Sequence, residues 1–155
     1  LVGRSEQARI WTQQIQLTIA DMLDEAPNSH HPIASSLFYE DQKPEALRRA
    51  QAFCTTRMPK YLQWFEQIVA RNPAGTRFLV GGKMSYADLS LFQLIEGLRY
   101  AFPKAMAHIE RKAPGVVGVH DRVAKQLRIK VYLASPRRIA FNESGIFRHY
   151  PELDG

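Results

Sequence analysis

The sequence predicts an all-α protein, a helical bundle of about five to six helices, and three observations support this prediction. Apolar residues recur every three to four positions through most of the 155 residues, which is the period of a helix face. No stretch alternates apolar and polar residues for long enough to form a sheet. Serines stand where helices would start, as at Ser5 and Ser85, and prolines fall where helices would end or break.

The first helix is expected over residues 5–26, with Ser5 as its cap and Pro27 as its stop. It carries a core stripe at the helical period, made of Ala8, Trp11, Ile15, Ile19, Met22 and Ala26. A second, mixed stripe lies beside it and is made of Ile10, Gln14, Leu17 and Asp21. Two such stripes are typical of a helix that packs on two sides. We therefore expect the mixed stripe to face a cleft or a second subunit.

Residues 27–43 read as a long loop that contains the histidine pair His30-His31. The next helix is expected over residues 44–71. Proline removes a helical hydrogen bond, so a kink or break is expected at Pro59. The apolar face of this helix consists of Leu47, Ala50, Cys54, Met58, Tyr61, Leu62, Phe65, Ile68 and Val69.

The most explicit helix start follows the segment 78–84. Ser85 is the expected cap, and the carboxylate of Asp88, three positions on, can reach back to the Ser85 amide in a capping box. Met84 and Leu89 would add a hydrophobic staple. The helix runs over residues 86–102 and is apolar around most of its circumference, which places it in the middle of the bundle.

Three shorter helices are expected after it, at residues 104–112, from Pro114-Gly115 onward, and at residues 129–134. The second of these presents Val116, Val119, Val123 and Leu127 on one face. Residues 135–155 look irregular but hold too much apolar surface for a solvated tail, namely Phe141, Ile146, Phe147 and Tyr150. The expected organisation is one helical domain over residues 1–155, with 135–155 packed back on it.

The charge, the apolar runs and the cysteine content of the chain limit the classes of function that are expected. The net charge of +6 favours anionic ligands or nucleic acid, but acids are interleaved with the basic residues and no aromatic side chains alternate with them. Nucleic acid is therefore an unlikely partner. No apolar run is long enough for a membrane span, so no membrane association is expected. Cys54 is the only cysteine, which excludes an internal disulfide, and we expect it to be a small buried hydrophobe.

The search for catalytic motifs gives a negative result. Residues 81–84 fail as a phosphate loop, because the glycine spacing is wrong and Met84 stands where serine or threonine is needed. The pair His30-His31 lacks the further ligands of a metal site. His120 and Asp121 are adjacent in a helix, and neighbours there are not expected to face each other. We predict no catalytic residue, no metal ligand and no tightly bound cofactor.

Several segments resemble the C-terminal, all-helical domain of the cytosolic glutathione transferases. The similarity covers the whole chain and is closest to sigma-like and pi-like members and their bacterial relatives. Its most specific part is the capping-box region, Phe78-Leu79-Val80-Gly81 through Ser85-Tyr86-Ala87-Asp88. The other similar segments are Leu1-Val2-Gly3-Arg4, Arg57-Met58-Pro59-Lys60-Tyr61-Leu62 and Arg128-Ile129 through Tyr132-Leu133-Ala134-Ser135.

The resemblance implies a two-domain parent enzyme that joins glutathione, its co-substrate, to hydrophobic electrophiles. A thioredoxin-like N-terminal domain would bind glutathione and carry the catalytic residue. That domain is absent from these residues, and the chain begins at Leu1 rather than methionine. We therefore expect a cut or processed N-terminus and no transferase activity from this chain alone. The parent protein would be a cytoplasmic homodimer with a role in detoxification.

The resemblance also implies roles for individual residues. Asp21 falls where an acid reaches across the dimer to the amino group of glutathione bound by the partner subunit. The hydrophobic-substrate pocket would draw on Leu23, Pro27, Asn28 and His31. Gln14, Ile15 and Thr18 would receive a side chain from the partner's N-terminal domain, although packing within this domain explains Ile15 equally well. Residues 26–29 depart from the family, since many relatives keep a longer helical turn with an aromatic there, and this changes the expected shape of the pocket.

Two other function classes remain open at this point. The same helical domain serves as a non-catalytic interaction module in translation factors and scaffold assemblies, and such a module does not need the acid at Asp21. A nucleic-acid-binding domain is supported by charge alone and predicts salt-sensitive binding.

Overall fold

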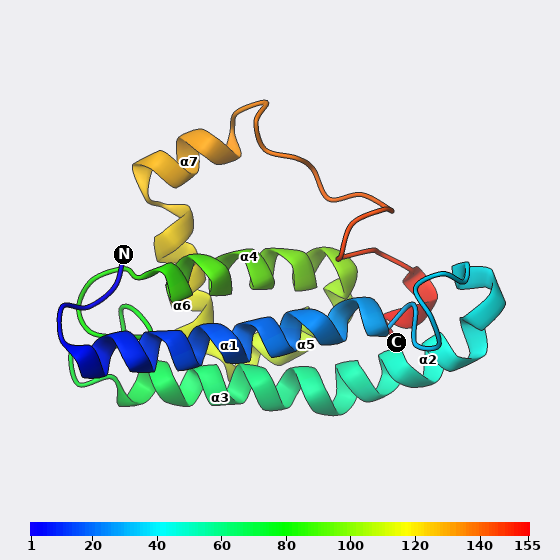
Figure 1. The fold of residues 1–155 in the computed structure, drawn as a ribbon, viewed down its shortest axis with the longest axis horizontal. Helices are drawn as coiled ribbons and strands as arrows, with labels where there is room; N and C mark the ends of the chain where they lie inside the picture. The colour runs from blue at the N-terminus through cyan, green and yellow to red at the C-terminus, as the bar shows by residue number, and fades with distance from the viewer.

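The computed structural model describes all residues 1–155 and contains helices but no strands, which confirms the all-α prediction. The three long helices are α1 (Glu6–Asn28), α3 (Met58–Arg71) and α4 (Tyr86–Ala101). In Figure 1, α1 runs between α4 and α3, with the shorter helices behind and around them. No helix combines the length and the hydropathy needed to cross a lipid bilayer.

Helix α1 begins as expected and ends later than expected. The Ser5 hydroxyl accepts the amide of Ala8 at 3.2 Å, and the core stripe is buried at Ile15 and along the helix beyond it. The prediction that Pro27 stops the helix is wrong, because α1 continues to Asn28. A proline in the last turn removes only one backbone bond. The amides after Pro27 still close the turn on the carbonyls of residues 26 and 27.

The helix predicted over 44–71 is divided near its proline, as expected. It comprises α2 (Lys43–Ala52), a π-helical segment η2 (Phe53–Arg57) and α3. The amide of Met58 donates to the carbonyl of Phe53, five residues back, so the ladder shifts by one residue just before Pro59. The extra residue breaks the continuity of the apolar face. Leu47, predicted in that face, is 45% exposed, so its assignment to the core is wrong.

Helix α4 is the centre of the bundle. It packs against α1 on one side and α6 (Pro114–Ala124) on another, which explains its nearly continuous apolar surface. Its start is fixed by Asp88, which has no exposed surface. One carboxylate oxygen accepts the amide of Leu79 at 2.8 Å, and the other accepts the amide and the hydroxyl of Ser85, both at 2.7 Å. Asp88 therefore joins the 78–81 loop to the first turn of α4.

Two of the short helices are capped by carboxylates from distant parts of the chain. Asp154 accepts two amides at the start of α5 (Pro103–Ile109), and Glu66 on α3 accepts the amides of Gly115 and Val116 at the start of α6. The segment η3 (Glu110–Lys112) links α5 to α6. Leu127 was expected on the face of α6, which is wrong. Helix α6 ends at Ala124, and Leu127 opens α7 (Leu127–Leu133), where it is 76% exposed.

The last twenty residues return from α7 over the end of α4 (orange to red in Figure 1). They end in a short 3-10 turn, η4 (Pro151–Leu153), which lies near a second such turn, η1 (Tyr39–Gln42). Phe147 and Leu153 are buried in the main core. The ring of Phe147 fills the space beside Gly97 on α4, where any Cβ would overlap it. The tail is therefore part of the packed domain.

Candidate functional site

A groove runs along the open face between α1 and α3, which approach each other less closely than α1 and α4 do. Its larger cavity, of about 940 Å³, lies between the first half of α1 and the last half of α3. Trp11 and Trp64 meet edge to face there, with ring centroids 6.3 Å apart. The apolar side chains of Ile10 and Ile68 and the amide of Gln14 also line it. This cavity combines an apolar lining with a few polar groups.

A second cavity, of about 470 Å³, continues the groove toward the middle of both helices. It is lined by Thr18 from α1 and by α3 residues that include Arg57 and Tyr61. Trp64 and Gln67 line both cavities, so the two are neighbours on one face. We call this face the α1–α3 groove.

A polar cluster borders the second cavity. Arg57 donates from Nε to both carboxylate oxygens of Glu25 at 3.0 Å, and the Tyr61 hydroxyl donates to the same carboxylate at 3.0 Å. The hydrogen bond from Arg57 holds the pKa of Glu25 below its usual value. Burial raises the pKa of Tyr61, and the negative charges of Glu25 and Asp21 add to that shift. Asp21 is thus an exposed acid whose charge reaches this cluster.

The predicted substrate-pocket residues do not all share one surface. Leu23 and Pro27 are half-buried and lie four residues apart, on one face of α1. Asn28 is exposed, lies on the side of Asp21, and donates from its side chain to the carbonyl of residue 24 at 2.9 Å. His31 is half-buried, its ring contacts His30, and its amide donates to the carbonyl of Pro27 at 2.9 Å. Neither cavity of the α1–α3 groove is lined by any of these residues.

The three residues expected to receive a partner's side chain do not share one surface either. Gln14 lines the larger cavity and Thr18 the smaller one. Ile15 has no exposed surface and belongs to the main core, so its placement on the receiving surface is wrong. The helical period explains this, because position 15 is turned about 100° away from position 14.

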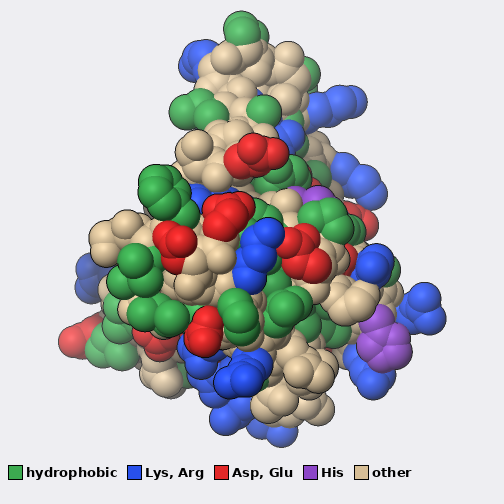
Figure 2. Space-filling view, turned by 90° about the vertical axis from the view of Figure 1, so that its right-hand side faces the viewer, with side chains coloured by type: hydrophobic (Ala, Val, Ile, Leu, Met, Phe, Trp, Pro, Cys, Tyr) green, Lys and Arg blue, Asp and Glu red, His purple; other side chains and the backbone are tan.

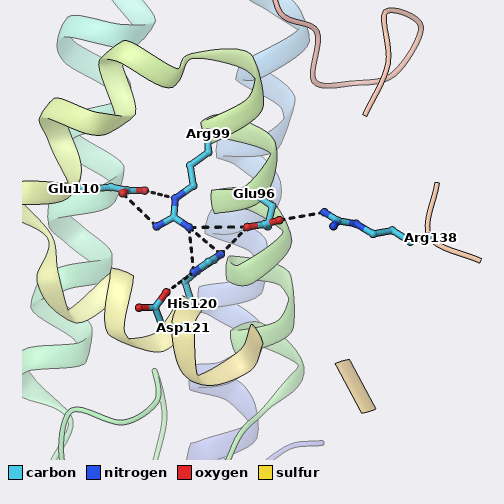
Figure 3. A network of polar contacts seen from close by, with 6 residues as sticks. All are labelled: Glu96, Arg99, Glu110, His120, Asp121 and Arg138. Carbon is cyan, nitrogen blue, oxygen red and sulfur yellow. Dashed lines mark hydrogen bonds and ion pairs between the residues drawn. The ribbon is translucent and has the colours of Figure 1, made fainter. Parts of the chain in front are cut away.

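A polar network on the other side of α4 was not anticipated (Figure 3). His120 on α6 contacts Glu96 of α4 through Nε2 at 2.8 Å and Asp121 through Nδ1 at 3.0 Å. Arg99 donates to Glu110 of η3 at 2.6 Å and approaches both ring nitrogens of His120. Arg138 from the tail donates to Glu96 at 3.1 Å. The network therefore ties α4, η3, α6 and the tail together around one buried imidazole.

The expectation that His120 and Asp121 do not face each other is wrong. The His120 ring stacks on Phe92, with centroids 5.0 Å apart, and this orientation turns Nδ1 back toward Asp121. The spacing of Glu96 and Arg99, three positions apart on one helix, is the sequence signal that could have indicated an ion-pair cluster. Their partners lie 11 to 42 residues away, which no local pattern reveals.

Replacing Arg99 with methionine should lower the free energy of unfolding by roughly 1–3 kcal/mol, because Glu110 and His120 lose a charged donor in a partly buried site. Urea unfolding followed by circular dichroism measures the change. The matched control is Arg111→Met, at an exposed position on η3, where a change within about 0.5 kcal/mol is expected. Equal effects of the two substitutions would contradict a stabilising role for the network.

The side chains present offer binding and positioning rather than bond-making chemistry. Burial raises the pKa of the Cys54 thiol to about 12, so the thiolate needed for nucleophilic attack does not form near neutral pH. The thiol packs near the carbonyl of Leu153 at 3.9 Å. No group of three or more histidine, cysteine or acidic side chains is arranged to hold a metal ion. The α1–α3 groove is a feature that can recognise another molecule.

Comparison with known proteins shows which family the chain is similar to. The family model described as "Glutathione S-transferase, C-terminal domain" matches residues 27–136, more than half of the chain. The "Glutathione S-transferase P" of Capra hircus is 27% identical over 82 residues, which cover 53% of this chain and 37% of that protein. The "Glutathione S-transferase" of Dirofilaria immitis is 25% identical over 119 residues, which cover 77% of this chain and 53% of that protein. The chain thus spans about a third to a half of these relatives.

A solved structure, the pi-class glutathione S-transferase of Onchocerca volvulus, superposes on 84% of this chain and 55% of its own chain, with a TM-score of 0.64. The sequence identity of that pair is 20%, so this likeness concerns the fold alone.

Proposed function

The chain belongs to the glutathione S-transferase family as a C-terminal domain, and on this premise we propose that it is the substrate-side domain of a dimeric transferase. In that reaction the thiolate sulfur of glutathione forms a bond to an electrophilic carbon of an apolar substrate, and the leaving group departs with its electron pair. The residue that activates the thiol lies outside these 155 residues. The chain alone is therefore expected to have no transferase activity.

The observation that carries the proposal is the α1–α3 groove and the exposed stripe beside it. Ile10, Gln14, Leu17 and Asp21 are all exposed on α1, and the groove that Gln14 helps to line is open to solvent. An apolar groove with an amide at its edge suits a large partner side chain. A second copy of the protein is the proposed occupant, and a two-fold dimer would present this face of each subunit to the other.

Asp21 is the proposed contact to glutathione. Its carboxylate is exposed, on the stripe that faces away from the core of this domain. The amino group of glutathione is positively charged at neutral pH, and an ion pair with hydrogen bonding between them is worth roughly 1.5–3 kcal/mol. This role requires the glutathione of the partner subunit to lie next to the α1–α3 groove.

The apolar electrophile is proposed to bind at the far end of α1. Exposed apolar side chains gather there on the segment after α1 and on the tail, namely Ile33, Leu37, Phe38 and Ile146. Figure 2 looks onto this end and shows hydrophobic side chains in its middle, among acidic and basic ones. Of the predicted pocket residues, Leu23 and Pro27 lie on the last two turns of α1 and His31 just beyond it, whereas the side chain of Asn28 donates to the carbonyl of Asp24. Detoxification and a cytoplasmic location stay predictions.

Replacing Asp21 with alanine in the two-domain protein should raise the KM for glutathione by about tenfold to 100-fold, because one charge-assisted contact is lost. Steady-state kinetics with a generic electrophile measure this, and kcat should change little. The matched control is Asp24→Ala, an exposed acid one turn further along α1. An unchanged KM in Asp21→Ala would rule out the glutathione contact.

A second candidate function is a non-catalytic interaction module, which α7 favours. This helix has no buried residue, and Leu127 and Val131 are 76% and 58% exposed. Such a short apolar helix is a suitable docking element for another protein. A conjugation assay on the two-domain protein distinguishes the two candidate functions. A transferase joins glutathione to a generic electrophile, whereas an interaction module does not.

A further inference from the structure

A third cavity, of about 710 Å³, lies on another face of α3 than the α1–α3 groove. One of its walls is formed by η2 and α3, and the other by α5 and η3. Helix α5 packs mainly against α4, so the space beside α3 stays open. The volume falls within the usual range of small-molecule sites, about 300–1,000 Å³. We call this space the α3–α5 cavity.

The inner part of the α3–α5 cavity is apolar. Leu62 of α3 has no exposed surface, and Ile109 of α5 is 7% exposed. Ala105 and Ala113 add small side chains that leave the space between the two walls unfilled. The thiol of Cys54 also lines the cavity, and it is uncharged at neutral pH. An apolar body placed in this space would leave water and gain the free energy of burial.

Cationic side chains gather on one wall of the cavity. Lys104 lies at the start of α5 and Lys112 at the end of η3, and both are exposed. His108 lies between them in the chain and lines the same cavity with an imidazole that can donate a hydrogen bond. The facing wall offers the uncharged hydroxyl of Thr55 and the amide of Gln63. The rim therefore presents positive charge and hydrogen-bond donors above an apolar interior.

The positive charge of this wall is not neutralised within the chain. Asp154 is the only acidic side chain that lines the cavity, and it is 3% exposed. Its oxygens accept the amides of Lys104 and Ala105 at 2.8 and 3.1 Å, which also fixes the start of α5. The ammonium group of Lys104 donates to the carbonyl oxygen of Gly155 at 3.0 Å. The ion pairs between side chains involve neither Lys104 nor Lys112.

We propose that the α3–α5 cavity binds a small organic anion with an apolar body, such as an aromatic sulfonate or carboxylate. The apolar body would lie against Leu62 and Ile109, and the anionic group would lie between Lys104 and Lys112. Lysine attracts anions as a point charge and without the fixed geometry of arginine, so the site would recognise charge and size rather than one particular acid. Glutathione and a partner subunit take no part in this proposal, which therefore does not depend on the proposed function.

Two dyes that differ by one sulfonate group test the proposal on this chain. Anilinonaphthalene sulfonate carries the anionic group, and phenylnaphthylamine is the same aromatic body without it. Both fluoresce more strongly in apolar surroundings, so fluorescence titration gives their dissociation constants. At low ionic strength the chain should bind the sulfonate about tenfold more tightly than the uncharged dye, and added salt should reduce this preference. Equal affinity for the two dyes would overturn the proposal.

A pair of double variants tests the role of the two lysines. Lys104→Gln, Lys112→Gln should weaken binding of the sulfonate by about tenfold and leave binding of the uncharged dye unchanged. The matched control, Lys83→Gln, Lys130→Gln, removes the same charge at exposed positions that line none of the three cavities, and it should bind both dyes as the wild type does. Equal losses in the two double variants would indicate an effect of net charge alone and would contradict the site.

An NMR titration of the isotope-labelled wild-type chain locates the bound sulfonate. The largest changes in amide chemical shift are expected at Thr55, His108 and Ile109, which line the α3–α5 cavity. Largest changes at Gln14 and Trp64 would place the dye in the α1–α3 groove instead and would overturn the proposal. This measurement needs no variant, so it decides the question even if a substituted chain does not fold.

Discussion

Replacing Asp88 with alanine is expected to lower the free energy of unfolding by about 3–5 kcal/mol, the largest effect of any single substitution considered for this chain. Asp88 is fully buried and accepts the amide of Leu79 together with the amide and hydroxyl of Ser85. Removing a buried acceptor leaves its donors without partners and without water. Since α4 is the central helix, its first turn and the 78–81 loop should loosen together. Urea unfolding at pH 7 measures the change.

Three further substitutions serve as comparisons for Asp88→Ala. Asp88→Asn keeps the shape but turns an NH₂ donor toward an amide that is itself a donor, so a large loss is expected again. Ser85→Ala removes only the hydroxyl of the cap and should cost about 1 kcal/mol. Glu143→Ala, at an exposed position in the tail, should stay within about 0.5 kcal/mol. An Asp88→Ala loss below that of Ser85→Ala would show that the capping carboxylate is not the main constraint.

Placing lysines in the α1–α3 groove should dissociate the proposed dimer. In the double variant Gln14→Lys, Gln67→Lys two positive charges line the larger cavity, close to the existing charge of Arg71. Charges that become buried without partners cost several kcal/mol, and a two-fold dimer contains the groove twice. The dissociation constant of the two-domain protein should rise by at least about 100-fold, as measured by sedimentation velocity over a concentration series.

The control for the groove variant carries the same added charge elsewhere. Gln51 and Gln126 are exposed and do not line the groove, so Gln51→Lys, Gln126→Lys should leave dimerisation unchanged. Both Gln14 and Gln67 are exposed in the single chain, and the folded monomer should keep its stability. A groove variant that remains dimeric would show that another face of the molecule forms the dimer.

Much of the fold follows from local rules that the sequence displays. The core stripe of α1, the apolar circumference of α4 and the break before Pro59 were all predicted from period and proline position. Two of the errors come from a local shift that periodicity does not contain. One extra residue in the π turn moves Leu47 out of the core, and the end of α6 at Ala124 moves Leu127 onto another helix.

The sites were harder to predict because their members meet over long sequence distances. His30 contacts Ile146, 116 positions away, and Arg138 contacts Glu96, 42 positions away. The sequence pattern of the loop therefore gives no indication that His30 is buried. The stripe that contains Gln14 and Asp21 was found, because one helix carries it. A cleft beside this stripe was expected, but its other wall was not identified, because that wall belongs to α3.

The contact between Gly97 and Phe147 makes two distant positions depend on each other in evolution. Glycine within a helix is about 1 kcal/mol less favourable than alanine, so α4 would gain from Gly97→Ala if the position were independent. Because an added methyl group overlaps the aromatic ring, that gain is available only after position 147 has become smaller. If Gly97→Ala occurs first, the added methyl group displaces Phe147 and with it the tail. Among descendants of this sequence, alanine at position 97 should therefore appear only in lineages that have already replaced the phenylalanine.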